Sequence, residues 1–450
     1  MENARKKTRW GWLRRDTLFV NQKLTTSDYA LPINENWGVN VGGFICTDLF
    51  WDNRLMVDAR DGGILLYPTA FRPDINNRDI NATPSFNLLA MNSRISLRIS
   101  VPSVWSANIS GFMEGWFMGV SNTGLNGFAL RHSYIKMDWE KTALLVGQTW
   151  HPMFTENCFA STLAASTGAP FQPFSRAPQI RFTQKFGKAL RLMAYANTQL
   201  DHSSTGFEGA SSQYLRHSSI PEMGLQFQYG KFKNYDEGKT STLFLIGIGV
   251  DYKRLTPRLV TGENKYTKKG VDCGAAILFT HYKYSIEASE MKKKRSFGVK
   301  AKGFYGGGCN EMLMIGGYAV KKYNDGELSY DDDFGYMALN MLSGWLDLYM
   351  ELGNWEFGIF SGYCKNLGAY QKIQDSNNLL SYWGRGIGVN QLYRASMRAK
   401  YNIGKLQMGF EPEYTLASYG SQFDDYGKVV KNSTDIVHGV RLLLSATLFF

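Results

Sequence analysis

The chain has few cysteines, no long apolar run and none of the short motifs that carry common enzymatic chemistry. Its five cysteines are odd in number and far apart, so they predict neither a disulfide framework nor a metal-ligand cluster of the CxxC type. No window of about 18 residues is continuously apolar, which excludes a helical membrane protein. HExxH, GxSxG, Walker A and EF-hand motifs are missing, and the six histidines show no ligand spacing. We therefore predict no enzyme activity, no metal and no other cofactor.

The segment 1–36 is basic near its start, with six Lys and Arg side chains between Arg5 and Arg15. The apolar stretch of about 7 to 15 residues that a signal peptide needs does not follow these charges. Either the protein is cytoplasmic, or Met1 is a mis-assigned or engineered start that an export segment precedes in the natural protein. We favour the second interpretation and expect residues 1–36 to be a periplasmic or poorly ordered segment.

Strict alternation of polar and apolar residues is the strongest pattern in the chain. Residues 94–101 alternate Arg and Ser with Ile, Leu and Val, and residues 393–401 alternate Arg, Ser and Lys with Tyr, Ala and Met. Successive side chains of a strand point to opposite faces, so each segment predicts a strand with one polar and one apolar face. This rule predicts about sixteen strands, near residues 37–50, 91–102, 107–120, 128–139, 142–150, 178–187, 189–199, 221–231, 240–254, 270–284, 295–305, 338–351, 355–368, 391–402, 406–418 and 435–450.

The connections between these strands alternate in length. Short turns fall at 102–106, 140–141, 187–188, 353–354 and 404–405, whereas long polar connections fall near 51–90, 151–177, 200–220, 306–337, 369–390 and 419–434. Outer-membrane barrels have short periplasmic turns and longer outer loops, whereas a soluble sandwich has no reason to keep that order. The sequence therefore predicts an all-β, antiparallel, up-and-down transmembrane β-barrel of about sixteen strands. Residues 37–450 are expected to form this single domain.

The apolar faces also need cover, and no long helical pattern provides it. A closed barrel turns these faces to lipid and pairs every backbone group, so that no strand edge remains in hydrocarbon. The last predicted strand is amphipathic and ends at the aromatic Phe450, as in barrels inserted by the outer-membrane assembly machinery. Trp37, Trp105, Trp139 and Trp355 lie at strand ends, where an interfacial aromatic girdle would place them.

Four motifs between residues 92 and 186 carry a family resemblance. The runs NSRISLR (92–98), FALRHSYI (128–135), LVGQTW (145–150) and APQIRF (177–182) occur in this order with strand and loop spacing between them. This region of about a hundred residues resembles the DcaP-like porins of Gram-negative outer membranes. The resemblance implies a sixteen-stranded homotrimeric channel for small, often anionic, solutes, in contact with membrane lipid and lipopolysaccharide. The chain departs from some members because residues 1–36 carry no heptad pattern.

The polar faces of the predicted strands carry more basic than acidic side chains, in a chain with a formal net charge of +11. Cationic rings in a water-filled lumen attract anions, so we predict a porin for passive diffusion of preferentially anionic solutes. No nucleic-acid-binding motif accompanies the basic charge, and no nucleic acid partner is expected. The predicted pore-lining residues are Arg94, Arg98, Glu114, Arg181, Lys185, Arg191, Lys300, Lys302, Arg394, Arg398, Lys400, Glu411, Glu413 and Arg441.

The loop 151–177 differs from the other long connections because it has only Glu156 and Arg176 as charges. It would be the third long outer connection, and in porins this loop often folds into the lumen. We expect it to fold inward and to limit the size of the pore, with Glu156 and Arg176 as constriction residues.

Two other functional hypotheses remain open at this point. The aromatic content suits a soluble or surface all-β protein that binds carbohydrate, built as a sandwich or propeller. A barrel hydrolase is also conceivable, with a Ser-His pair that includes His132 or His281. Detergent dependence would distinguish a barrel from the soluble protein, and hydrolysis that is lost on changing a histidine would identify the enzyme.

Overall fold

The computed structural model describes residues 30–34, 37–235, 240–286, 294–430 and 434–450. Most of the predicted basic segment 1–36 lies outside these residues, as do 236–239 and 287–293. The end of that segment forms strand β1 (Ala30–Asn34), which pairs with the first barrel strand. Within the described part of the chain, no helix has the length and apolar character that crossing a membrane would need.

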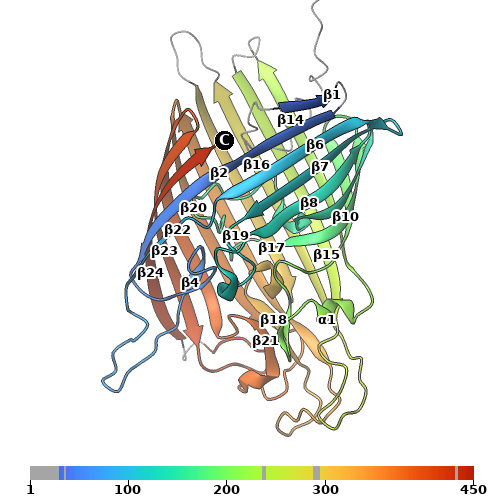
Figure 1. Ribbon diagram of the computed structural model, residues 1–450. Coiled ribbons are helices and arrows are strands. Elements are labelled where there is room, and N and C mark those ends of the chain that lie inside the picture. Colours follow the sequence, from blue (N-terminus) through green and yellow to red (C-terminus); the bar gives the residue numbers. More distant parts are fainter. Residues whose placement is uncertain (1–29, 35–36, 236–239, 287–293, 431–433) are drawn as a thin grey trace, which may run out of the picture.

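Sixteen antiparallel strands close into one barrel (Figure 1). Every neighbouring pair is joined by backbone hydrogen bonds, so the sandwich and propeller architectures are excluded. In chain order the barrel strands are β2 (Trp37–Asp52), β6 (Arg94–Val104), β7 (Ala107–Trp116), β8 (Ala129–Asp138), β9 (Thr142–Trp150), β10 (Arg176–Phe186), β11 (Leu190–Asn197), β14 (Glu222–Tyr235), β15 (Thr240–Leu255), β16 (Val271–Ile286), β17 (Arg295–Gly307), β19 (Tyr336–Leu352), β20 (Trp355–Gly368), β22 (Val389–Ile403), β23 (Leu406–Gly420) and β24 (Thr434–Phe449).

Short elements lie in the long connections, which gather at the lower end of the barrel in Figure 1. They are the strands β3 (Met56–Ala59), β4 (Ile64–Pro68), β5 (Ser85–Leu89), β12 (Thr205–Gly206), β13 (Gly209–Ala210), β18 (Gly316–Val320) and β21 (Tyr382–Arg385), the helix α1 (Gln213–Arg216), and single 3₁₀ turns at Asn122–Gly124, Pro152–Phe154, Asn310–Met312 and Leu379–Ser381.

The sixteen predicted strands are all confirmed, and those at 142–150 and 355–368 have the predicted bounds. Short turns also lie where they were predicted, because two-residue turns between twisted strands favour residues with positive φ. Gly353 and Gly404 take φ values of +61° and +58° in two of these turns. The long connections at the opposite end include 117–128 and 256–270, which were not among the predicted long loops.

The first and last barrel strands, β2 and β24, close the barrel. The second half of β2 pairs with β24, from Phe44 opposite Phe449 to Asp52 opposite Arg441. The backbone of Phe450 exchanges two hydrogen bonds with Gly43, which places the terminal aromatic of the predicted last strand at this seam. The sheet therefore has no open edge between its first and last long strands.

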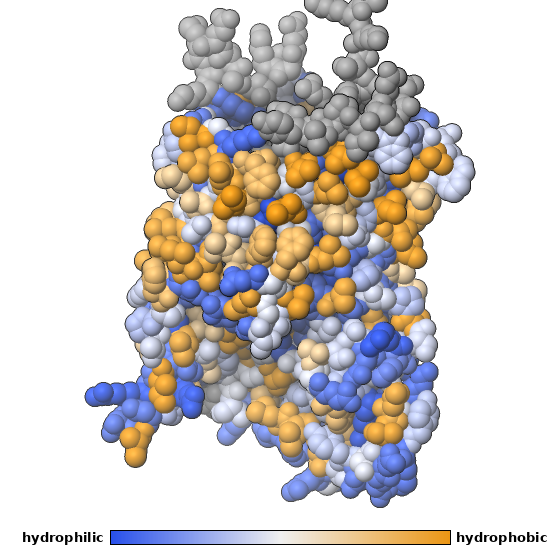
Figure 2. Space-filling model, viewed as in Figure 1, coloured by the Kyte–Doolittle hydropathy of each residue, from blue (hydrophilic) through white to orange (hydrophobic). Residues whose placement is uncertain are grey.

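On the face shown in Figure 2, apolar residues gather over the upper part of the wall, and hydrophilic residues are more frequent at the end that carries the long loops. Exposed and buried residues alternate along β15, where Phe244, Ile246, Ile248 and Val250 are all more than a third exposed. Trp37, Trp105 and Trp355 are also exposed, near the ends of strands. This distribution matches a wall that faces hydrocarbon.

All five cysteines are free and buried, as expected for cysteines that pack as small apolar side chains. Burial raises the pKa of the Cys158 thiol, the one cysteine in the connection between β9 and β10. This thiol is therefore protonated and unreactive at neutral pH.

Candidate functional site

The connection 151–175, here called the lumen loop, runs inside the barrel. It leaves β9 at His151, whose Nδ1 accepts a hydrogen bond from the Met153 amide at 3.2 Å and so caps the 3₁₀ turn Pro152–Phe154. Phe154 and Phe171 are almost completely buried. The side chain of Phe171 lies against Gly362 of β20, far along the chain from the loop. This contact joins the loop to β20, a strand far along the sequence from β9.

Carboxylates of the wall formed by β19–β23 accept hydrogen bonds from the backbone of the lumen loop. The Ser161 amide donates to Asp347 at 2.8 Å. The amides of Leu163 and Ala164 both donate to Glu411, the second at 3.2 Å. Because these acceptors are charged and buried, each contact is stronger than an ordinary amide hydrogen bond.

Cations of the same side of the barrel donate to carbonyls and a hydroxyl of the lumen loop. Lys300 donates to the Ser161 hydroxyl at 2.6 Å, Lys400 to the Ser161 carbonyl at 2.8 Å and Arg394 to the Ala169 carbonyl at 3.0 Å. Lys302 bonds to the carbonyl of Phe154. Four residues predicted to line the pore therefore hold the lumen loop against the wall.

Further predicted pore-lining residues are paired with each other or with neighbours. Arg398 lies 2.6 Å from Asp347 and 3.3 Å from Glu356. Glu413 lies 3.5 Å from Arg394. Glu356 is not among the predicted site residues, although it lies on the polar face of a predicted strand.

The opposite wall, β6–β11, keeps partly exposed cations on its inner face. Arg98, Arg181 and Lys185 are neither buried nor fully exposed, and the same holds for Arg191. Arg98 stacks on the Phe112 ring at 5.6 Å and, among the described residues, forms no ion pair. Arg181 donates to the Trp150 carbonyl at 2.9 Å, and Lys185 to the Trp139 carbonyl at 2.9 Å.

Lys136 belongs to this cationic wall, and the sequence prediction missed it. Its side chain is about one-third exposed and lies 2.9 Å from Asp138. The sequence contained a signal for Lys136, because alternate residues of a strand share one face, and Lys136 lies between Tyr134 and Asp138 on the polar face of this strand. Glu156 of the lumen loop is exposed and is, besides Asp138, an acidic residue of this region.

Arg176, the other predicted constriction residue, is only 1% exposed. Its guanidinium lies 2.8 Å from Asp201 and stacks on Trp116 with its central carbon 4.5 Å from the ring centroid. Arg94 and Glu114 belong to the same cluster, in which Arg131, which was not predicted, donates to Glu114 at 2.7 Å. The structure thus places Arg176 in the wall beside the root of the lumen loop, away from water.

Asp201 and His202 lie in the outer connection between β11 and β14. Burial by itself would raise the pKa of the Asp201 carboxyl, but Arg176 at 2.8 Å and Arg60 at 3.7 Å outweigh it and hold this pKa below its usual range. Burial lowers the pKa of His202 to about 4, so its imidazole is neutral at neutral pH.

We expect the protein to lose stability as the pH falls from about 6.5 to about 4, because only the unfolded chain protonates His202 in this window. The pKa difference corresponds to at most about 3 kcal/mol. The stabilisation that follows from the lowered pKa of Asp201 is fully present above the ordinary Asp pKa and is lost at still lower pH. Urea unfolding at several pH values measures the effect, and His202→Gln should flatten the dependence. Equal pH profiles for both proteins would contradict it.

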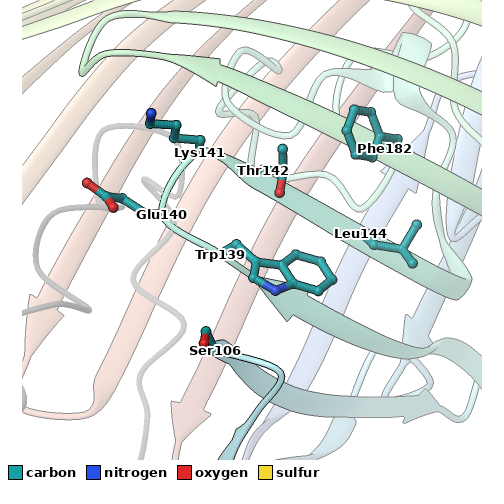
Figure 3. A pocket seen from close by; sticks show the side chains of 7 residues that line it. All are labelled: Ser106, Trp139, Glu140, Lys141, Thr142, Leu144 and Phe182. Carbon is teal, nitrogen blue, oxygen red and sulfur yellow. The ribbon is translucent and has the colours of Figure 1, made fainter.

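A surface pocket of about 550 Å³ lies elsewhere, beside two short turns (Figure 3). Trp139, Leu144 and Phe182 form its apolar part, with Ser106 and the turn 140–142 at its edge. The Trp139 indole N–H donates to the Trp105 carbonyl at 2.9 Å and ties the two turns together. Leu144 and Phe182 belong to the apolar outer faces of their strands, so this pocket is not part of the lumen.

Comparisons with known proteins identify the fold. No family model matches the chain, and no curated protein matches its sequence. The outer membrane channel DcaP of Acinetobacter baumannii aligns with 93% of this chain and 99% of its own, with a TM-score of 0.60 and 16% sequence identity. OmpT of Vibrio cholerae covers 93% of this chain and 99% of its own at a TM-score of 0.48 and 8% identity. The anion-selective porin from Comamonas acidovorans covers 92% of this chain and 100% of its own at a TM-score of 0.47 and 10% identity. The likeness to DcaP agrees with the resemblance in residues 92–186 at the level of the fold.

Proposed function

We propose that the protein is a porin of a Gram-negative outer membrane, a water-filled channel for passive diffusion of small, preferentially anionic solutes. One observation carries this proposal. The lumen loop is bound to the wall β17–β23, while the inner face of β6–β11 keeps partly exposed polar side chains. A solute path along this second wall would pass Arg98, Lys136 and Arg181.

The charges along this path favour anions. The cations Arg98, Lys136, Arg181 and Lys185 outnumber the carboxylates Glu156 and Asp138, and low-dielectric walls focus their field into the lumen. The guanidinium groups of Arg98 and Arg181 also match carboxylates and phosphates in geometry. The wall therefore both concentrates anions and offers them donors.

Planar-bilayer recordings of the purified protein test the proposal. We expect discrete conductance steps and a reversal potential in a salt gradient that reports anion preference. Arg98→Gln with Arg181→Gln should reduce the anion-to-cation permeability ratio several-fold, because two partly exposed cations leave the path. Lys188→Gln, in a short turn at the rim, is the matched control and should leave the ratio near that of the wild type. Absence of conductance would refute the channel, and an unchanged ratio in the double variant would refute the anion path.

The partners follow from the same proposal. Membrane lipid and lipopolysaccharide would cover the apolar band, and we propose a homotrimer, as the resemblance to DcaP-like porins implies. The strands β6–β11 are 8 to 11 residues long, whereas β14–β24 of the barrel have 13 to 17. The shorter wall is where copies would pack. Native mass spectrometry in detergent should give three times the chain mass, and a monomer mass would refute the trimer.

A further inference from the structure

A buried cluster of ionisable side chains lies at the root of the lumen loop. His151, Glu222 of β14 and Asp251 of β15 each offer one ligand atom, and these atoms lie within 4.8 Å of one another. The three residues are 3%, 1% and 7% exposed. His151 Nε2 and Glu222 Oε1 are 3.4 Å apart, and neither atom has a hydrogen-bond partner in the described part of the chain.

The charges in this cluster do not balance. Besides Glu222 and Asp251, the cluster contains a third buried carboxyl group, that of Glu311. Among the described residues, the cation that forms ion pairs in this cluster is Lys253, which contacts Glu311 and lies 3.8 Å from Glu222. Three carboxylates thus face one ammonium away from water, where uncompensated charge is costly. With all three carboxyl groups ionised, a bound divalent cation would bring the net charge of the cluster to zero.

We propose that His151, Glu222 and Asp251 form a binding site for a divalent transition metal, with Zn²⁺ as the ion that these donors fit best. One imidazole and two carboxylates are ligands typical of Zn²⁺ sites, and they leave a fourth position for water. Ca²⁺ and Mg²⁺ prefer oxygen ligands throughout, whereas this cluster offers the imidazole nitrogen of His151. The inference concerns a different place from the solute path and does not rest on the channel function.

Small movements would bring the ligands to bonding distance. A tetrahedral Zn²⁺ with bonds of about 2.0 Å separates its ligand atoms by about 3.3 Å. His151 and Glu222 already meet this spacing at 3.4 Å. The hydroxyl of Tyr195 donates to Asp251 Oδ2 at 2.9 Å, which orients that carboxylate as an outer-shell partner does.

Metal binding through His151 would break one hydrogen bond of the lumen loop. Nδ1 accepts the Met153 amide proton, so the neutral imidazole carries its own proton on Nε2. Binding through Nε2 requires this proton to move to Nδ1, and the Met153 hydrogen bond is then given up. The metal would replace this cap by a link from the first residue of the lumen loop to β14 and β15.

The test is the metal content of the full chain, purified without a polyhistidine tag and refolded in detergent with Zn²⁺ or with Mg²⁺. After dialysis, inductively coupled plasma mass spectrometry should find about one Zn²⁺ per chain and no retained Mg²⁺. Glu222→Gln should lose the Zn²⁺. Asp272→Asn is the matched control, because this carboxylate lies on the neighbouring strand β16 but is exposed and paired with Arg254 at 3.0 Å. Zn²⁺ retained equally by Glu222→Gln would overturn the site.

A milder variant and a second readout cover the case in which Glu222→Gln does not fold. Tyr195→Phe keeps the ligands and should weaken Zn²⁺ binding about tenfold. Co²⁺ in place of Zn²⁺ should give the intense visible absorption of tetrahedral coordination, and excess Zn²⁺ should abolish it. If the wild type retains neither ion, the carboxyls of Asp251 and Glu222 share a proton instead, and the proposal fails.

Discussion

Deleting residues 158–172 is expected to raise the single-channel conductance several-fold. The segment contains the lumen loop's contacts with Asp347, Glu411 and Arg394. Its removal would free the space that it occupies beside the β17–β23 wall. A barrel of sixteen strands without an inward loop leaves a wide aqueous channel, so the current is limited by what this segment occupies. Planar-bilayer recordings in symmetric salt measure the change, and the exclusion limit for neutral sugars should rise with it.

The control deletion removes residues 74–78, which form the tip of an exposed outer connection and contact none of the lumen residues named above. Its conductance should match that of the wild type. Gel mobility before and after heating shows whether both variants form barrels. A folded 158–172 deletion with unchanged conductance would refute the constriction role of the lumen loop.

Replacing Asp52 by alanine is expected to lower the free energy of unfolding by about 3 to 5 kcal/mol. Arg441 and Asp52 lie opposite each other on β24 and β2, with Nε–Oδ1 and Nη2–Oδ2 distances of 2.8 and 2.6 Å. Both side chains are 4% exposed. Arg441 also donates to the Gly62 carbonyl at 2.6 Å and stacks on Phe50, so it would remain buried without its counter-charge.

Denaturant unfolding followed by tryptophan fluorescence in detergent measures this loss. Asp272→Ala breaks an exposed pair and should change stability by no more than about 1 kcal/mol. Replacing both partners, Asp52→Leu with Arg441→Met, should recover most of the loss, because the unpaired charge is the main cost. A loss for Asp52→Ala as small as that of the control would show that the closing pair contributes little.

Much of the fold could be predicted from the sequence because a barrel strand is a local pattern. The alternation in 94–101 and 393–401 specifies which side chains face outward, and turn residues such as Gly353 mark where the chain reverses. The inward course of the loop 151–177 is a prediction of the same kind, since a long connection with two charges is unlike an outer loop. The long loops 117–128 and 256–270 were not predicted, because a loop has no periodic pattern that marks its length.

The roles of individual lumen charges could not be read in the same way. Arg98 and Arg394 occupy equivalent positions in similar alternating strands, yet one is partly exposed and the other holds Ala169 of the lumen loop. Arg176 begins β10 and Asp201 follows β11, so two strands and a turn separate residues that meet only in the folded wall. Alternation within a strand determined the barrel and the inner face of each segment. Which charges are paired was decided by the tertiary structure alone, because their partners come from distant strands and from the loop that crosses between them.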